Sequence, residues 1–383
     1  PATVQLAVSF NGRHYEPTTF AFTFYHEPGL TALSPMSGPA LEMQCISFSC
    51  PRGRSVGTLV TVTGTRLDGG GVPSLYRCRF NATVVPATLI SASAIRCHAP
   101  GSVAAGEATL RLSSNAQDFS HESLRFSFEP AILVSRIEPA LGPASGGTNI
   151  TLFGSHLVGG SHYQCRFGSY VSPAESVLVV DPADNASSTR AVTCSTPAWA
   201  PLDADRDGHR MELHRASMAL SLNGQQFTLV GHYFAYYHDA ELASISPNVG
   251  PVAGGLEVRL YGSRLDGGDR ESYDHLWVSQ LEDIRARSTY RCRLSNAASA
   301  IIATVAATWR ASDAAVVCRT PPVDIGAQRE LNASVAVSLN GLDFTATSVL
   351  FTYVASPTLD GLLPLSGPSL GGVVVTLTGS GFV

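Results

Sequence analysis

Residues 138–147 read Glu-Pro-Ala-Leu-Gly-Pro-Ala-Ser-Gly-Gly, and this stretch opens a unit that recurs along the chain. Related stretches begin at Ser34, Ser246 and Leu363. Their shared Gly-Pro pairs place glycine at positions 38, 142, 250 and 367, with spacings of 104, 108 and 117 residues. Repeats of this length are whole domains, because the units of a solenoid recur every ~20–50 residues.

Each copy is followed by the same succession of short strands. The first strand alternates apolar and polar residues and ends at glycine, in Leu59–Gly64, Ile150–Gly154, Leu256–Gly262 and Val374–Gly379. This period of two is typical of a half-buried antiparallel strand. A Tyr-x-Cys-Arg-Phe/Leu strand and a Cys-x-x-Pro turn follow in the three complete copies. Many short strands separated by turn signals predict an all-β sandwich.

Each unit closes with a hairpin and an aromatic strand. Asn-Gly occupies the hairpin at Asn11, Asn223 and Asn340, and Asn115-Ala116 is a degenerate version. Asn-Gly favours a type I′ turn, so a tight hairpin is expected at these positions. The last strand carries an aromatic ring at every second residue, as in Phe126-Ser-Phe128 and Phe351-Thr-Tyr353.

The Ser-Pro-x-x-Gly-Pro-x-x-Gly-Gly opening, the strand to glycine, the Cys-x-Phe and the Cys-x-x-Pro together resemble IPT/TIG domains. One departure is that the copy at Ser34 lacks the second glycine pair and has a longer segment there. The resemblance implies tandem immunoglobulin-like, early-set β-sandwiches, which occur in plexins, Met-type receptors, fibrocystin-like proteins, Rel-type transcription factors and some starch enzymes. The predicted domains are a final part at 1–29, complete domains at 30–130, 131–239 and 240–354, and an opening part at 355–383.

The predicted domains follow one another without a Gly/Ser-rich or Pro-rich linker. Glu129-Pro130 leads at once toward Ile137, and Asp239 toward Ile245. Directly abutting sandwiches favour an extended, semi-rigid array. The two end pieces are too small to bury a core alone, so we expect the natural chain to extend in both directions.

The repeat indicates how the eight cysteines pair in disulfides. Each complete domain has one cysteine in the Cys-x-Phe/Leu strand and one before the turn proline. The predicted disulfides join Cys78 to Cys97, Cys165 to Cys194 and Cys292 to Cys318, and pair Cys45 with Cys50 inside the extra segment of the first domain. One bond per domain is typical of an oxidising compartment. The alternatives are buried thiols or a metal site, although Cys-x-x-Cys is absent.

Four Asn-x-Ser/Thr sequons mark acceptors for N-linked glycans, at Asn81, Asn149, Asn185 and Asn332. Together with the cysteines they predict a secreted or cell-surface glycoprotein.

Specific recognition is expected where the domains differ, because loops on a rigid sandwich usually carry it. The first domain inserts 41–56, the second 201–215 and the third 269–289. The last insertion contains four apolar residues at near-helical spacing, Leu276, Trp277, Leu281 and Ile284. They predict a short amphipathic helix that forms a partner interface, the alternative being a cap on its own sandwich.

A calcium candidate lies in the second insertion. Asp203, Asp205 and Asp207 precede Gly208 in the spacing of the first half of a calcium loop. The position that should hold glutamate is His214, which favours an ordinary Asp-Gly turn.

Composition excludes several activities. All 25 basic residues are arginine, so this stretch has no lysine for a Schiff base or a phosphate loop. The nucleophile elbow Gly-x-Ser-x-Gly and the zinc motif His-Glu-x-x-His are also absent. We therefore expect no enzyme and no cofactor other than glycans. A net charge of −5 disfavours nucleic-acid binding. No apolar run approaches the roughly 20 residues of a membrane helix.

These observations predict a non-enzymatic structural and adhesive segment of a large extracellular, cell-surface or filament glycoprotein. Its domains would space and join protein chains, including copies of itself. The lysine-free, alanine-rich composition suggests a GC-rich microbe or green alga, where such an array could coat a cell or cilium. Two alternatives remain, a ligand-binding receptor ectodomain of plexin or Met type and the accessory domains of a secreted polysaccharide-active enzyme. A propeller or a catalytic domain in the flanking sequence would decide between them.

Overall fold

The computed structural model describes residues 2–40, 57–69, 72–101, 104–180, 188–199, 214–267, 290–326 and 328–381. In these residues it contains 28 β-strands and two 3₁₀ turns, at Pro73–Leu75 and Ala311–Asp313, and no α-helix. The chain divides into two compact units. One holds Pro1–Glu138, Ile150–Ser195 and Ser217–His232, and the other holds Pro139–Asn149, Thr196–Ala216 and Tyr233–Val383.

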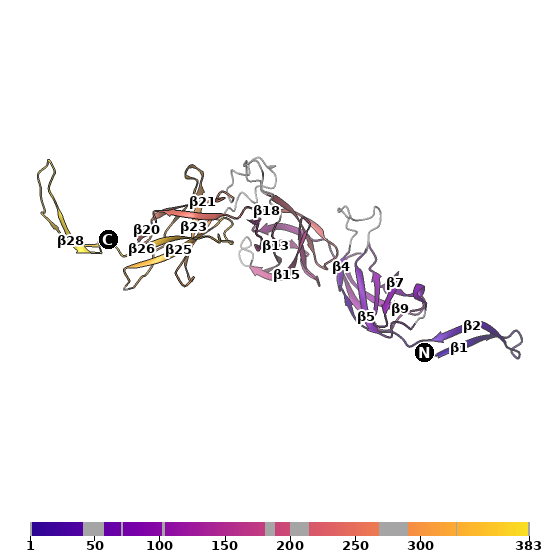
Figure 1. The fold of residues 1–383 in the computed structure, drawn as a ribbon. Helices are drawn as coiled ribbons and strands as arrows, with labels where there is room; N and C mark the ends of the chain where they lie inside the picture. Colours follow the sequence, from indigo (N-terminus) through magenta and orange to yellow (C-terminus); the bar gives the residue numbers. More distant parts are fainter. Residues whose placement is uncertain are drawn as a thin grey trace. The chain divides into compact units, whose positions relative to one another are not determined.

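The first sandwich has eight strands in the spatial order β3-β5-β8-β7-β6-β9-β10-β4, drawn in indigo and purple in Figure 1. In chain order they are β3 (Gly29–Ser34), β4 (Ser37–Pro39), β5 (Leu59–Thr65), β6 (Arg77–Phe80), β7 (Thr83–Ser91), β8 (Ala94–His98), β9 (Gly106–Ser113) and β10 (Leu124–Glu129). All neighbours are antiparallel except β4 and β10.

Strand β7 belongs to both layers of this sandwich. Its residues 83–86 pair with β6, and its residues 87–91 pair with β8. One layer is therefore built from β3, β5 and β8, and the other from β6, β9, β10 and β4. The alternating pattern of β5 buries Val60 and Val62 between the layers, against Leu110, Leu112 and Phe126. This core explains why the period-two stretches form strands in this fold.

The second and third sandwiches repeat this order strand for strand. The second contains β11 (Leu133–Glu138), β12 (Leu141–Pro143), β13 (Asn149–Ser155), β14 (Gln164–Phe167), β15 (Tyr170–Val180), β16 (Ser188–Ser195), β17 (His214–Ser221) and β18 (Thr228–Tyr237). The third contains β19 (Glu241–Ser246), β20 (Val249–Pro251), β21 (Glu257–Ser263), β22 (Arg291–Ser295), β23 (Ile301–Arg310), β24 (Ala315–Arg319), β25 (Glu330–Ser338) and β26 (Val349–Val354). The tandem immunoglobulin-like fold predicted from the repeat is confirmed.

The repeated Gly-Pro pair sits in the short parallel strand of each sandwich. Gly38 pairs with Phe128, Gly142 with Tyr236 and Gly250 with Tyr353. A Cβ atom at Gly38 would lie 2.1 Å from the Thr58 hydroxyl oxygen. The first residue of the Gly-Pro pair is therefore glycine, because the short strand passes too close to its neighbour for any side chain at this position.

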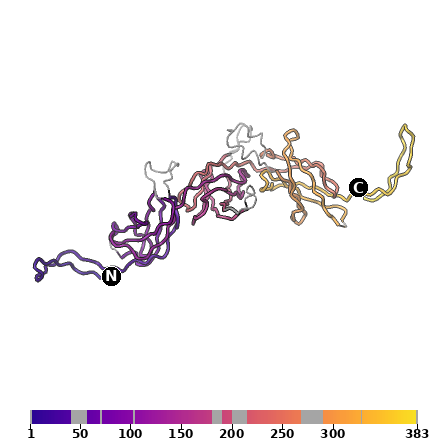
Figure 2. The backbone as a smooth tube through the Cα atoms, turned by 180° about the vertical axis from the view of Figure 1, so that it is seen from behind, coloured from indigo at the N-terminus to yellow at the C-terminus, as the bar shows by residue number. Residues whose placement is uncertain are grey.

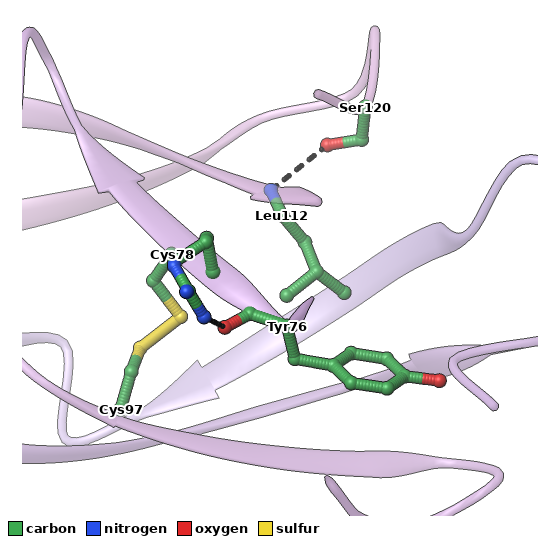
Figure 3. Close-up of a disulfide and its surroundings, with 6 residues drawn as sticks. Tyr76, Cys78, Cys97, Leu112 and Ser120 are labelled. Carbon is green, nitrogen blue, oxygen red and sulfur yellow. Dashed lines mark hydrogen bonds between the residues drawn. A yellow bond between two sulfur atoms is a disulfide. The ribbon is translucent and has the colours of Figure 1, made fainter. Parts of the chain in front are cut away.

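The disulfides cross between the two layers. Cys78 of β6 is bonded to Cys97 of β8, beside the buried Tyr76 (Figure 3). The other sandwiches have the same bond, in the pairs Cys165–Cys194 and Cys292–Cys318. Each bond closes a loop of 19, 29 or 26 residues. A loop of that size should stabilise its sandwich by about 3 kcal/mol on the chain-entropy account.

Two hairpins lie at the ends of the chain, and Figure 2 shows the first as two adjacent runs of backbone. Among the described strands, β1 (Ala2–Val8) and β2 (Glu16–Phe24) pair only with each other, as do β27 (Thr358–Leu363) and β28 (Thr376–Ser380). Their apolar side chains are exposed, including Phe20, Phe22 and Leu363.

The prediction of a tight type I′ turn at the Asn-Gly pairs is wrong. Such a turn needs positive φ at both central residues, whereas in the three Asn-Gly pairs only the glycines, Gly12, Gly224 and Gly341, have it. The asparagine instead forms an Asx turn, in which its Oδ1 accepts hydrogen bonds from the backbone two and three residues later. The result is a longer loop, six residues between β17 and β18.

Candidate functional site: the joints between sandwiches

The loops at Asn223 and Asn340 lie against the sandwich that precedes them in the chain. We call the contact of Asn223–Phe227 with Ser37, Thr58 and Leu59 the first joint. The contact of Asn340–Phe344 with Leu141 and Thr148 is the second joint. Each joint lies wholly within one of the two compact units.

The first joint is a cluster of amide and hydroxyl groups. The Asn223 amide donates to Gln226 Oε1 at 2.6 Å, to Thr58 Oγ1 at 3.3 Å and to the Ser37 carbonyl at 3.4 Å. The Thr58 hydroxyl donates to Gln226 Oε1 at 3.1 Å. The Gln225 side chain completes the joint, because it binds both the N–H and the carbonyl of Leu59, each at 2.8 Å.

The second joint repeats this arrangement with a carboxylate. The Asn340 amide donates to the Leu141 carbonyl at 3.1 Å and to Asp343 Oδ2 at 2.7 Å. The Thr148 hydroxyl donates to the same oxygen at 2.6 Å. Asn223 and Asn340 are both only 5% exposed, which shows that these polar groups are buried at the joints. Buried polar groups need their partners, so each joint fixes its loop in one position.

An arginine anchors each loop to its own sandwich. The guanidinium that follows the first cysteine lies over a loop phenylalanine in all three sandwiches. The pairs are Arg79 with Phe119 at 4.2 Å, Arg166 with Phe227 at 4.8 Å and Arg293 with Phe344 at 4.1 Å. At these distances the ring attracts the cation. At the two joints, the loop therefore contacts its own domain through the phenylalanine and the preceding domain through the asparagine amide.

Glycine-rich loops also contact the end of the part of the chain that precedes each sandwich. Gly69 faces Tyr25, Gly159 faces Glu129, and Gly267 faces Tyr237. A Cβ atom at Gly159 would lie 2.5 Å from the Glu129 carboxylate, and one at Gly267 would lie 3.1 Å from the Tyr237 Cβ. These glycines let the end of one sandwich approach the first loop of the next.

Apolar contacts accompany the polar ones. At the second joint, Leu141, Ala235 and Tyr237 belong to the same buried cluster as the core of the third sandwich. At the first joint, a mostly apolar cavity is lined by Pro39, Pro130, Ala131, Ile132 and Leu222, with Ser37 and Asn223 among its polar members.

The first sandwich carries the same loop in an open setting. Asn115 Oδ1 accepts from the N–H groups of Gln117 and Asp118, and its amide donates to Asp118 Oδ2 at 2.8 Å. Asp118 is exposed, whereas Asn223 and Asn340 are buried. The internal geometry of the loop therefore forms without a joint, which makes Asn115 and Asp118 natural controls for the joint residues.

The structure places the predicted site residues as follows. The three disulfides of the complete sandwiches form between the predicted cysteines. Asn81, Asn149 and Asn332 are exposed on their sandwiches. The remaining predicted residues lie outside the part of the chain that the structure describes: Cys45, Cys50, Asn185, Asp203, Asp205, Asp207, Leu276, Trp277, Leu281 and Ile284.

Sequence reasoning did not find the joints. The available signal was the repeat Asn-Gly/Ala-x-x-Phe with glutamine or aspartate as the fourth residue, together with the repeat Leu-x-Gly-Gly. The Asn-Gly pairs alone predict only a turn within one domain. In the described part of the chain, no helix is long and apolar enough to cross a membrane. The same residues contain no group of three or more side chains suited to hold a metal ion.

The IPT/TIG domain family matches residues 44–128, 133–232 and 240–353. The chain is 34% identical to human plexin-B1 over 156 residues, which cover 41% of this chain and 6% of that protein. It is 24% identical to mouse fibrocystin-L over 374 residues, which cover 93% of this chain and 7% of that protein. The full extracellular region of plexin A4 is similar at 16% identity and a TM-score of 0.42, over 90% of this chain and 26% of that structure.

The chain thus spans only a small part of the length of its curated relatives. Its disulfides are typical of proteins that pass through the secretory pathway. The family matches cover most of the chain and fall one on each complete sandwich, so this chain belongs to the IPT/TIG domain family.

Proposed function

We propose that this chain is a non-enzymatic spacer and adhesive segment of an extracellular or cell-surface glycoprotein. Its sandwiches would hold a set spacing and angle while their insertions bind other protein chains, including further copies of this chain. The observation that carries the proposal is the repeated joint. Asn223 with Thr58 and Asn340 with Thr148 use the same loop and the same type of hydroxyl. A chain that served only as a flexible tether would have no need of buried polar groups between its domains.

Small-angle X-ray scattering of the full chain tests the spacer. The double variant Asn223→Ala, Asn340→Ala should broaden the distribution of interatomic distances, because each joint loses its amide donor. Asn115→Ala is the matched control, since Asn115 makes the same bonds inside its loop but lies in no polar joint of this kind. An identical distribution for the double variant and the wild type would contradict the spacer function.

The adhesive role is tested separately through the third insertion. Trp277→Ser with Leu281→Ser should weaken self-association of the full chain in sedimentation experiments and leave its thermal unfolding unchanged. Self-association that is unaltered would favour the alternative, in which these residues cover their own sandwich. A ciliary or microbial surface location would be tested by immunogold labelling of native cells.

The second candidate is a receptor ectodomain, and the similarity to plexins favours it. This function predicts a soluble protein ligand that binds one copy of the chain with saturable affinity. Binding of that kind to a chain that does not associate with itself would replace the adhesive proposal.

A further inference from the structure

Asn149 lies at the second joint, directly after Thr148, whose hydroxyl donates to Asp343. It is the exposed first residue of β13 and begins the sequon Asn149-Ile150-Thr151. Among the described residues, its side-chain amide has no hydrogen-bond partner. The other described sequons differ, because Asn81 Oδ1 accepts from Thr109 and Asn332 Oδ1 accepts from Thr352.

The corresponding residue at the first joint is Leu59, which directly follows Thr58. Leu59, the first residue of β5, lies beyond the end of the neighbouring strand β3. The last residue of β3, Ser34, pairs with Thr61, so no residue of β3 lies opposite Leu59. The Gln225 side chain binds both backbone groups of Leu59 and so continues the sheet where the strand has stopped. Asn149 has the same place in the second sandwich, because Glu138, the last residue of β11, pairs with Thr151.

The second joint lacks this glutamine clamp, by which we mean a glutamine side chain that binds both backbone groups of the first residue of the strand. The loop residue that corresponds to Gln225 is Leu342, which follows Asn340-Gly341 as Gln225 follows Asn223-Gly224. A leucine side chain can neither donate nor accept a hydrogen bond. Leu342 is 57% exposed. It directly precedes Asp343, whose carboxylate accepts from Thr148, and Thr148 directly precedes Asn149 at the start of β13. A cover that is apolar toward Leu342 and polar toward water would suit this place.

We propose that Asn149 carries an N-linked glycan whose first sugars cover Leu342 and the start of β13, in the place that Gln225 has at the first joint. The donor is a lipid-pyrophosphate-linked oligosaccharide. A bond forms between Asn149 Nδ2 and C1 of the first sugar, the bond from C1 to the pyrophosphate oxygen breaks, and the amide loses one proton. The inference rests on the proposed passage through the secretory pathway, and it assigns to this one sequon a role in the joint.

The test begins with the full chain secreted from eukaryotic cells, with glycan occupancy measured for each sequon by peptide mass spectrometry. Hydrogen exchange is then measured at the loop residues 340–344. Asn149→Gln should abolish the glycan and give several-fold faster exchange in this loop. Thr151→Ala removes the same sequon and keeps Asn149, so it should give the same result if the first variant folds poorly. Asn332→Gln is the matched control, because it removes an exposed sequon from β25, and it should leave the loop unchanged.

A rescue variant separates the role in the joint from a general effect of sugar. Leu342→Gln in the Asn149→Gln background recreates the glutamine clamp and should restore slow exchange in the loop. Glycans on Asn81 or Asn332 with a bare Asn149 would overturn the inference and leave the proposed function standing. An occupied Asn149 whose removal does not change exchange would also overturn it. Bare asparagine at all sequons would instead overturn the proposed secretory location, and the inference with it.

Discussion

Single residues show how the two joints reach the same geometry with different chemistry. Gln226 and Asp343 are each the fourth residue of the loop, and each accepts hydrogen bonds from an asparagine amide and a threonine hydroxyl. The amide is neutral and the carboxylate is charged. The threonine bond is shorter to the carboxylate, 2.6 Å against 3.1 Å, as expected for a charge-assisted hydrogen bond. The asparagine bonds are alike, at 2.7 and 2.6 Å.

Replacing Asp343 by alanine should therefore weaken the second joint more than the same change weakens an open loop. Asp343→Ala leaves the Thr148 hydroxyl and the Asn340 amide without their acceptor, at a cost of about 1–3 kcal/mol. Asp118→Ala removes the bond to Asn115 in an exposed setting, where water can replace it. Urea unfolding of the full chain should show the larger loss of stability for Asp343→Ala. Equal losses would mean that the second joint adds nothing to stability.

Tyr353 makes the stability of the third sandwich sensitive to alkaline pH. Burial raises the pKa of Tyr353 from 10.0 to about 12, and its hydroxyl donates to the Pro321 carbonyl at 3.0 Å. A raised pKa means that the neutral form favours the folded state. Its contribution is therefore complete below pH 10 and is lost as the pH rises toward 12. Urea midpoints of the wild type should fall more steeply across this range than those of Tyr353→Phe, with the half-buried Tyr261→Phe as control. Parallel curves for all three proteins would refute the assignment.

At the scale of strands and turns, the sequence predicted the sandwich but not the joints. Alternation in Leu59–Gly64 fixed which side chains face the core, because a strand has only two faces. The Asn-Gly pairs were misread because a dipeptide preference takes no account of a neighbouring domain. Asn223 bonds to its own loop through Oδ1 and Nδ2, and Nδ2 also bonds to the preceding sandwich, at partners 165 and 186 residues away. No local pattern contains such a contact.

The turn itself gives a matched pair of predictions with opposite signs. Ala116 has φ of 65°, the left-handed conformation that Gly224 and Gly341 adopt at the same place in the other loops. Ala116→Gly should stabilise the first sandwich by roughly 1 kcal/mol, because alanine pays a steric penalty there. Gly224→Ala should destabilise the second sandwich by a similar amount, since the nearest atom to its new Cβ lies at an ordinary 3.4 Å. Thermal unfolding measures both changes, and a loss of stability in Ala116→Gly would contradict the turn assignment.

For the whole molecule, the joints predict that neighbouring sandwiches unfold together. The division into two compact units passes through the second sandwich, because its loop at Asn223 belongs with the first sandwich and its Pro139–Asn149 segment with the third. The joints have three and two hydrogen bonds between sandwiches that are buried or partly buried. Bonds of this number contribute a few kcal/mol, which is a large share of the roughly 5–15 kcal/mol that stabilises one domain. Coupling of this size should merge the transitions of the three sandwiches in a calorimetric scan.

Calorimetry of the full chain tests that coupling. Asn223→Ala with Asn340→Ala should split the merged transition and lower the temperature at which the second sandwich unfolds, because that sandwich takes part in both joints. Asn115→Ala should leave the profile undivided, since its loop has the same internal bonds and lies in an open setting. Separate transitions already present in the wild type would show that the sandwiches are independent. The buried polar groups at the joints would then set the direction of each domain and add little to its stability.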